Sequence, residues 1–454
     1  MKRLLLASAL FSSLAFAQTQ EDRIKQLEEQ IRMLQQEVQR LKEEQKKTEE
    51  TKQETEALKE EIRKLRLDIA LPQLEIKSYS GLGPAASKVH FNPRGVSIGG
   101  YGEFTFLHND VNARGGAKSI ADVQRIILYL GYAFDERLKF NSELELEHAS
   151  TSGEHGTGGA YFKAELAYLD YNLRPEFGLR GGLLLMPVGI INEIHEPPTF
   201  PSAERPFFER RMTLSTWEEM GLGVYGTVGM VDYRFYLING LMLKGGGGYN
   251  AQEPLKNIRQ RGARAIADRF GFTGRVDINL PYNLKVGGSF VSSHVQSKGG
   301  NDSQLNLRRG SKVGSVNMFF PHLWWQYAGW DVRLVGGLVK VNDARRMSQD
   351  LGGGAVIPEE QKGFYVQVAH DVFRYFNIEN QELYLFGIYE DFDTHSKVPT
   401  GFSKPNGHKL RVYNVGLSYK PHPLVAIKAD YARLNYSPNR RDEKEYRLTL
   451  GFMF

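Results

Sequence analysis

Hydrophobic residues recur with two different periods along this chain. Near the N-terminus the spacing alternates between three and four residues, which is the heptad pattern of an α-helical coiled coil. From about residue 95 to the C-terminus the spacing is two, which is the pattern of half-buried β-strands. The pattern therefore predicts an α-helical coiled coil followed by an all-β part. The heptad seam begins with Ile24, Leu27, Ile31, Leu34, Val38 and Leu41.

The predicted coiled coil is interrupted in its middle. Polar residues occupy the seam after Leu41, and apolar spacing resumes at Leu58 in a shifted frame, as in a stammer. The apolar spacing continues to Ile69, and Pro72 ends the helix. A single solvated helix remains an alternative for the polar middle. Branched residues at heptad position a and leucine at position d favour a dimer when the coiled coil is isolated. If the barrel forms a trimer, the barrel and not the coiled coil would have to set the number of chains.

The all-β part divides into strand-like segments whose apolar residues alternate with polar ones. Sixteen such segments are predicted, at residues 95–107, 120–133, 138–149, 160–173, 177–186, 220–228, 231–239, 268–280, 284–295, 310–326, 330–342, 362–373, 381–391, 409–420, 424–435 and 445–454. In the third segment Leu138, Phe140 and Leu144 alternate with Lys139 and Glu143. One face is therefore expected to meet lipid and the other a polar interior.

The connectors between these segments alternate in length, which is how outer-membrane barrels are built. An even strand number leaves both termini on the side of the short turns, the periplasm, so the coiled coil is expected there. The sequence thus predicts an all-β transmembrane barrel of about 16 antiparallel strands. The short turns are predicted at residues 134–137, 174–176, 229–230, 281–283, 327–329, 374–380 and 421–423.

Both ends of the chain carry export signals. Lys2 and Arg3 precede a short apolar run that ends in Ala15-Phe16-Ala17, the pattern of a cleavable signal peptide. Strict alternation up to the terminal Phe454 resembles the signal read by the bacterial barrel-assembly machinery. The expected organisation is a signal peptide (1–17), a periplasmic coiled coil (18–71), a linker (72–94) and an outer-membrane barrel (95–454).

Composition agrees with this assignment. The 454 residues include 47 glycines, 22 tyrosines, 26 phenylalanines and no cysteine, so an exported chain would gain no stability from disulfides. Trp324, Trp325, Tyr327 and Trp330 lie beside a predicted short turn and are expected to form part of an aromatic girdle. A platform on which sugars stack is the alternative for these four residues.

One stretch resembles a known family. Glu196-Pro197-Pro198-Thr199-Phe200 continues through Arg205 to Thr216-Trp217-Glu218-Glu219-Met220-Gly221-Leu222-Gly223. Together with the signal peptide, coiled coil and barrel, it is similar to the phosphate-selective porins O and P, especially their branch with a periplasmic coiled coil. The resemblance implies a homotrimer of separate pores in outer-membrane lipid and lipopolysaccharide. It also implies arginine- or lysine-lined lumens that favour small anions, although this chain has no compact lysine cluster.

The candidate anion-selectivity residues are arginines, whose planar guanidinium can bind carboxylate or phosphate with two hydrogen bonds. The long third loop, 187–219, could set the pore size, and its charges could instead only pair and hold the loop in place. The arginines of the later loop could instead contact lipopolysaccharide. Candidates are Arg205, Arg210 and Arg211 in the third loop, Arg259, Arg261, Arg264 and Arg269 in and after a later loop, and Arg125, Arg234, Arg275, Arg333 and Arg411 on strands.

Catalytic and cofactor sites are not predicted. The sequence has no cysteine nucleophile, no paired-histidine zinc motif, no Gly-x-Ser-x-Gly elbow and no Walker-type loop. His195-Glu196 is interpreted as a solvated or charge-paired loop dipeptide, so no metal is expected, and no nucleic-acid partner is expected either. Two functions are left open. One is passive diffusion of small anions such as phosphate or carboxylates, and the other is a structural tether whose coiled coil bridges the periplasm.

Overall fold

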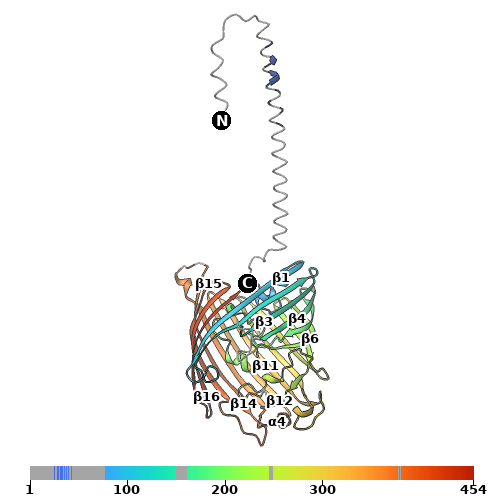
Figure 1. Cartoon of the computed structure of the whole chain (residues 1–454), viewed down its shortest axis with the longest axis vertical. Helices are drawn as coiled ribbons and strands as arrows, with labels where there is room; N and C mark the ends of the chain where they lie inside the picture. The colour runs from blue at the N-terminus through green and yellow to red at the C-terminus, as the bar shows by residue number, and fades with distance from the viewer. Residues whose placement is uncertain are drawn as a thin grey trace. The chain divides into compact units, whose positions relative to one another are not determined.

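Strands dominate the computed structural model, which describes residues 77–149, 161–244, 249–376, 378 and 380–454, with isolated residues between 25 and 42. Figure 1 shows the strands wrapping around a common axis as a barrel, each strand tilted relative to that axis. The strands are β1 Gly95–Asn109, β2 Ser119–Ala133, β3 Leu138–Glu147, β4 Tyr161–Arg174, β5 Phe177–Leu185, β6 Glu218–Val228, β7 Val231–Asn239, β8 Leu241–Leu243, β9 Phe270–Leu280, β10 Leu284–Ser297, β11 Lys312–Tyr327, β12 Trp330–Asn342, β13 Glu360–Asp371, β14 Glu382–Lys397, β15 Lys409–His422, β16 Val425–Ser437 and β17 Glu443–Met453.

Sixteen of these strands form the barrel wall, which confirms the predicted number. Each pairs antiparallel with its neighbours, and β1 pairs with β17 in the register Tyr101↔Met453, which closes the sheet. The seventeenth, β8, is a short strand parallel to β10 and was not predicted. At the closing seam Phe454 exchanges backbone hydrogen bonds with Gly100 (3.0 and 2.9 Å). The largest difference in bounds is in β14, which continues to Lys397 rather than to residue 391.

The two faces of the wall differ as the alternation predicts. In β9, Phe270 and Phe272 are exposed on the outer face, whereas Arg275 and Asp277 are buried on the inner face. In β17, Leu448 is likewise exposed and its neighbour Arg447 is buried. An apolar outer face and a polar inner face are the arrangement of a barrel that meets hydrocarbon on its outside.

A short helix occupies the barrel interior within the stretch predicted as a linker. Helix α2 (Pro84–Phe91) packs against β1, β2 and β3. Pro84 at its first turn suits a helix start, because proline lacks the N–H that would have no partner there. The Lys139 ammonium donates to the carbonyls of Val89 (3.2 Å), His90 (2.8 Å) and Asn92 (2.8 Å) at the helix end. Part of the predicted linker is therefore a folded part of the compact unit that spans residues 72–454.

The barrel interior is filled largely by loop 3, which we define as residues 186–217 between β5 and β6. It contains a 3₁₀ turn, η1 (Pro197–Thr199), and a one-turn helix, α3 (Phe207–Arg211). Apolar side chains of this loop, including Phe208 and Trp217, are almost fully buried within the barrel. The smaller elements elsewhere are η3 (Lys256–Ile258), η4 (Gly300–Asp302), α4 (Ala344–Leu351) and η5 (Val372–Phe376).

The predicted signal peptide and almost all of the predicted coiled coil lie outside the described residues. Isolated described positions between Lys25 and Lys42 are helical and exposed. None of the helices in the described part of the chain combines the length and the apolar character needed to cross a membrane.

Candidate functional site

Loop 3 crosses the barrel interior and contacts strands on several sides. Gly189 donates its backbone N–H to Ser289 of β10 (3.1 Å), and Asp430 of β16 accepts from the N–H of Ala203 (2.8 Å). The Lys428 ammonium, also on β16, donates to the Ser202 carbonyl (2.9 Å). The loop is therefore held inside the barrel by strands on different sides of the wall.

The far end of loop 3 is anchored by α3. Glu390 of β14 accepts the N–H groups of Phe207 (3.1 Å) and Phe208 (2.6 Å), which satisfies two of the free donors at the helix start. The ring of Phe208 packs against Phe320 and Phe392, with ring centroids 6.3 and 6.1 Å apart. This packing fixes the arginines that follow on the same helix.

The three predicted arginines of loop 3, here called the loop-3 arginines, are Arg205, Arg210 and Arg211. Arg210 lies 3.4 Å from Glu204, and its side chain is 38% exposed. Arg211 donates to the Tyr436 hydroxyl (3.2 Å) and is partly exposed. Arg205 is buried, and its Nη2 has no hydrogen-bond partner in the described structure. Arg210 and Arg211 therefore keep surface that solvent can reach, whereas the unpartnered donor of Arg205 is buried.

Glu204 marks the centre of a larger basic cluster. Arg125 of β2 pairs with Glu103 (3.1 Å), and Arg447 of β17 pairs with Asp430 (2.8 Å). Burial acts to raise the pKa of Glu204, but Arg210, Arg447, Arg125 and Arg205 hold this pKa below its ordinary value. Glu204 is therefore ionised, close to arginines of the loop and to wall arginines that are themselves paired with carboxylates.

Other predicted arginines are fully engaged with carboxylates. Arg234 lies 3.0 Å from Glu193 and 2.9 Å from Asp277. Arg275 pairs with Asp277 (2.8 Å), lies 3.6 Å from Glu193, and donates to the Gly189 carbonyl. All four side chains are almost fully buried. These arginines hold the first part of loop 3 against the wall.

Arg333 has the same holding role on β12. It pairs with Asp331 (2.8 Å), donates to the Thr199 carbonyl of loop 3 (2.6 Å) and lies 4.5 Å from the centre of the Trp324 ring. We call Arg234, Arg275 and Arg333 the clamp arginines. Trp324 was predicted to belong to the outer aromatic girdle, but this contact shows that its ring is on the inner face. Tyr327 and Trp330 are exposed, as the girdle prediction requires.

Arg411 was predicted to face the lumen, and this orientation is wrong. The neighbours of Arg411 on β15, Leu410 and Val412, are buried, whereas Arg411 is exposed and pairs with Asp391 of β14 (2.8 Å). At this end of the strand the inner face packs against an apolar core, and the apolar and polar sides are exchanged. Alternation alone therefore assigned the wrong face.

The arginines of the loop between β8 and β9 divide into two kinds. Arg259 is buried and donates to the carbonyls of Leu214 and Thr216 (both 2.6 Å), which holds the end of loop 3. Burial, reinforced by Arg261, lowers the pKa of Arg259 to about 10. Arg261 lies 3.8 Å from Glu218 and is 43% exposed, and Arg264 and Arg269 are exposed. The most basic loop of the sequence therefore supplies one structural arginine and a set of surface charges.

Two cavities lie beside loop 3 near the short turns. One has a volume of about 680 Å³ and is bordered by Tyr79, Tyr225, Arg234 and Lys285. The other, of about 300 Å³, is bordered by Phe200, Asp331, Tyr384 and Lys420. Ser78, Ile194, Trp324 and Gln326 border both, so the cavities are adjacent. Open space lined by both polar and apolar side chains is thus present beside the loop, on the side where the barrel has its short turns.

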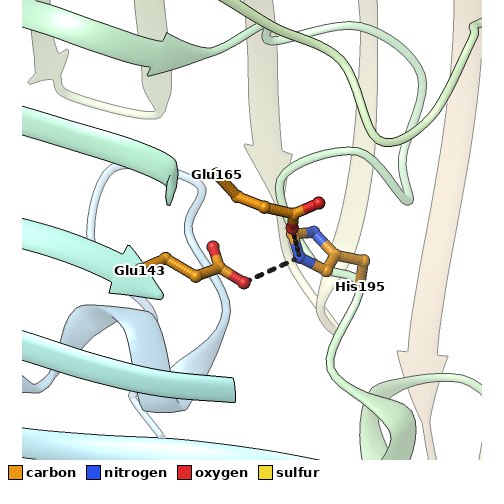
Figure 2. Close-up of side chains that lie close together, drawn as sticks. All are labelled: Glu143, Glu165 and His195. Carbon is orange, nitrogen blue, oxygen red and sulfur yellow. Dashed lines mark hydrogen bonds and ion pairs between the residues drawn. The ribbon is translucent and has the colours of Figure 1, made fainter. Parts of the chain in front are cut away.

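A second group of charges lies at the middle of loop 3. Figure 2 shows Glu143 of β3 and Glu165 of β4 pointing toward the ring of His195. The His195 Nε2 is 3.4 Å from Glu143 Oε1 and 3.5 Å from Glu165 Oε2, and all three side chains are buried. The sequence predicted a solvated or charge-paired His195, and the structure shows it buried and charge-paired. Its partners Glu143 and Glu165 were not predicted, because they are remote in sequence and only the barrel wall brings them to His195.

Comparison with known proteins identifies a relative and a fold. No family model matches the chain. A protein of Aquifex aeolicus (strain VF5), described only as uncharacterized, is 50% identical over the full length of both chains. Among solved structures, Salmonella typhi OmpF in complex with daunomycin has a TM-score of 0.50 at 10% identity over 80% of this chain and 98% of its own. The outer membrane channel DcaP of Acinetobacter baumannii also has a TM-score of 0.50, at 11% identity over 79% of this chain and 97% of its own.

Proposed function

We propose that this chain, which belongs to the same family as the uncharacterized Aquifex aeolicus protein, forms a passive diffusion channel in the outer membrane that prefers small anions. The observation that carries the proposal is a closed barrel of sixteen long strands with loop 3 folded into its interior. A loop held inside a wide barrel narrows the space through which solutes pass and so excludes large ones. The sheet closes through its own strand pairing, so the loop is not needed to complete the barrel wall. The fold shared with OmpF and DcaP supports the same reading.

The anion preference rests on the loop-3 arginines. Arg210 and Arg211 keep exposed surface, and Arg205 adds a buried positive charge whose Nη2 has no hydrogen-bond partner in the described structure. Rings of arginine select anions in pores, because the fixed positive charge raises the local anion concentration. The clamp arginines contribute little to this field, since each is neutralised by a carboxylate within 3.0 Å. We take phosphate and small carboxylates as the preferred solutes, because the guanidinium fork fits both.

The test is the zero-current potential of the purified protein in a planar bilayer under a tenfold KCl gradient. The expected sign is that of anion permeation, with current reduced by phosphate or succinate. A cation-sign potential would overturn the anion preference and leave a general channel. Absence of any conductance from correctly folded protein would overturn the channel itself.

We further propose that the protein is a homotrimer with its N-terminal coiled coil in the periplasm. Each subunit is taken to form its own pore in a membrane of lipid and lipopolysaccharide after insertion by the barrel-assembly machinery, with Phe454 as part of the signal. Mass measurement of the detergent-solubilised protein tests the trimer. A monomeric mass under conditions that preserve the fold would contradict it.

A structural tether is a second candidate, favoured by the way the chain enters the barrel. Helix α2 is fixed to the wall by Lys139 and to loop 3 by Glu196, which accepts the N–H of Ala86 (2.9 Å). A pulling force on the preceding segment would therefore be resisted by folded structure. Deleting residues 21–69 tests this function in cells. If the envelope becomes leaky while channel currents stay normal, the tether is supported, and an intact envelope contradicts it.

A further inference from the structure

We propose that Glu143, Glu165 and His195 form a binding site for a divalent transition-metal ion, with zinc the best match, that fixes loop 3 to the barrel wall. The three potential ligand atoms lie within 4.8 Å of one another. They come from three separate elements, β3, β4 and loop 3, so an ion held by them would connect the loop to two neighbouring strands (Figure 2). In the described part of the chain, this is the one set of three or more His, Cys, Asp or Glu residues whose potential ligand atoms lie this close together.

The distances distinguish this group from ordinary histidine–carboxylate pairs. Three other contacts of that kind in the described residues, His148–Asp122, His322–Asp277 and His408–Asp393, are each 2.6 Å long. The two contacts of His195 are 3.4 and 3.5 Å, which is long for a charge-assisted hydrogen bond. Metal bonds of about 2.0–2.1 Å in a tetrahedral zinc site separate neighbouring ligand atoms by about 3.4 Å. The two distances from His195 Nε2 to the glutamate oxygens therefore match two of the distances between neighbouring ligand atoms in a tetrahedral zinc site.

The orientation of His195 also suits a metal ligand. Its Nδ1 lies 2.9 Å from the Asn192 carbonyl, which can only accept a hydrogen bond, so Nδ1 carries the proton. In the neutral ring Nε2 then presents a lone pair, and this lone pair faces two carboxylate oxygens. A hydrogen bond from the other ring nitrogen to a backbone carbonyl is the usual way in which metal-binding histidines are oriented.

Unbalanced charge provides the second, independent observation. Glu143 is fully buried, and its Oε2 has no hydrogen-bond partner. Glu145, also buried, lies next to the group, and Lys163 is shared between Glu145 (2.7 Å) and Glu165 (3.2 Å). With the His195 ring neutral, the Lys163 ammonium alone faces three buried carboxylates, and a proton on His195 is the alternative source of positive charge. Buried charge without compensation is costly, and a divalent ion would supply the missing positive charge.

The donor set indicates the class of ion. One imidazole nitrogen and two carboxylate oxygens match zinc and similar first-row ions, whereas magnesium and calcium prefer sites made only of oxygen. A fourth position remains for water or for the free Oε2 of Glu143. The role inferred is structural, because His195 belongs to the part of loop 3 that is buried against the wall.

The experiment measures zinc bound by the folded full-length protein in detergent after removal of metals with a chelator. We expect about one zinc per chain, and at least about tenfold weaker binding in His195→Gln and Glu165→Gln. His408→Gln is the matched control, because it removes a buried histidine that pairs with a carboxylate at 2.6 Å away from loop 3, and it should bind zinc like the natural chain. Equal binding by the natural chain and His195→Gln would overturn the proposal.

Crystals of the natural protein soaked in zinc provide a test that does not depend on variants folding. An anomalous peak between His195 and the two glutamates is expected, and its absence would overturn the site. Zinc binding is measured without conductance, so its failure leaves the channel proposal standing. A missing current would equally leave the metal site standing.

Discussion

The clamp arginines and the loop-3 arginines occupy the same barrel interior and differ in their partners. Arg234 and Arg275 share Glu193 and Asp277, and every one of these groups is buried. Arg210 has one carboxylate at 3.4 Å and remains 38% exposed. The same residue type therefore holds the loop in one place and leaves charge exposed in another. The difference shows that the positive charge exposed inside the barrel depends on how many carboxylates each arginine pairs with, and not on how many arginines the interior contains.

Breaking a clamp should have the largest effect on stability. Replacing Arg275 by Met leaves Asp277 and Glu193 with a single buried arginine, which should lower the free energy of unfolding by about 3–5 kcal/mol. Urea unfolding of the barrel refolded in lipid vesicles measures this loss. The double variant Arg275→Met/Asp277→Leu should recover part of it, since neither charge then stays unpaired. An unchanged unfolding midpoint in the single variant would show that the pair does not support the fold.

Replacing Lys139 should have an effect of intermediate size on stability, and it tests helix α2, the other element inside the barrel. Lys139→Met removes three charge-assisted hydrogen bonds to the end of α2 and should cost about 1.5–3 kcal/mol. Single-channel conductance should rise if α2, no longer held at the wall, leaves the barrel interior. Arg137→Met is the control, because Arg137 is exposed at the neighbouring turn. A conductance equal to that of the control would show that α2 does not narrow the channel.

Replacing loop-3 arginines should change selectivity and leave stability nearly intact. A unit charge about 4 Å from a solute in water contributes about 1 kcal/mol, or about fivefold in permeability. Arg210→Gln/Arg211→Gln should therefore lower the anion-to-cation permeability ratio by about that factor or more. The zero-current potential measures this ratio, and the unfolding midpoint serves as the control. If the ratio is unchanged, these arginines do not set the preference.

The smallest effect is expected from the exposed arginines of the loop before β9. Arg261→Gln/Arg264→Gln/Arg269→Gln should shift the zero-current potential slightly at low salt. The shift should disappear above about 0.1 M salt, where charges more than about 10 Å apart are screened. A shift that persists at high salt would place these residues within reach of the solute path.

The sequence predicted the wall of this barrel far better than its contents. Alternation with period two is a local property, so the number of strands, their order and the short turns could be assigned before the structure was known. Arg125, Arg234, Arg275 and Arg333 face inward as predicted. The outward orientation of Arg411 was missed, because the inner face at that end packs against apolar side chains and reverses the usual pattern.

The contents of the barrel were decided by tertiary structure. Helix α2 lies within a stretch whose glycine, proline and serine content predicts a linker, and its position depends on Lys139 far along the chain. The pairing of arginines with carboxylates and the meeting of His195 with Glu143 and Glu165 depend on closure of the sheet and on the path of loop 3. The sequence by itself determined a sixteen-stranded wall, because each strand needs only its own alternation. Only the folded barrel decided which charges neutralise one another, because that depends on distances between residues remote in sequence.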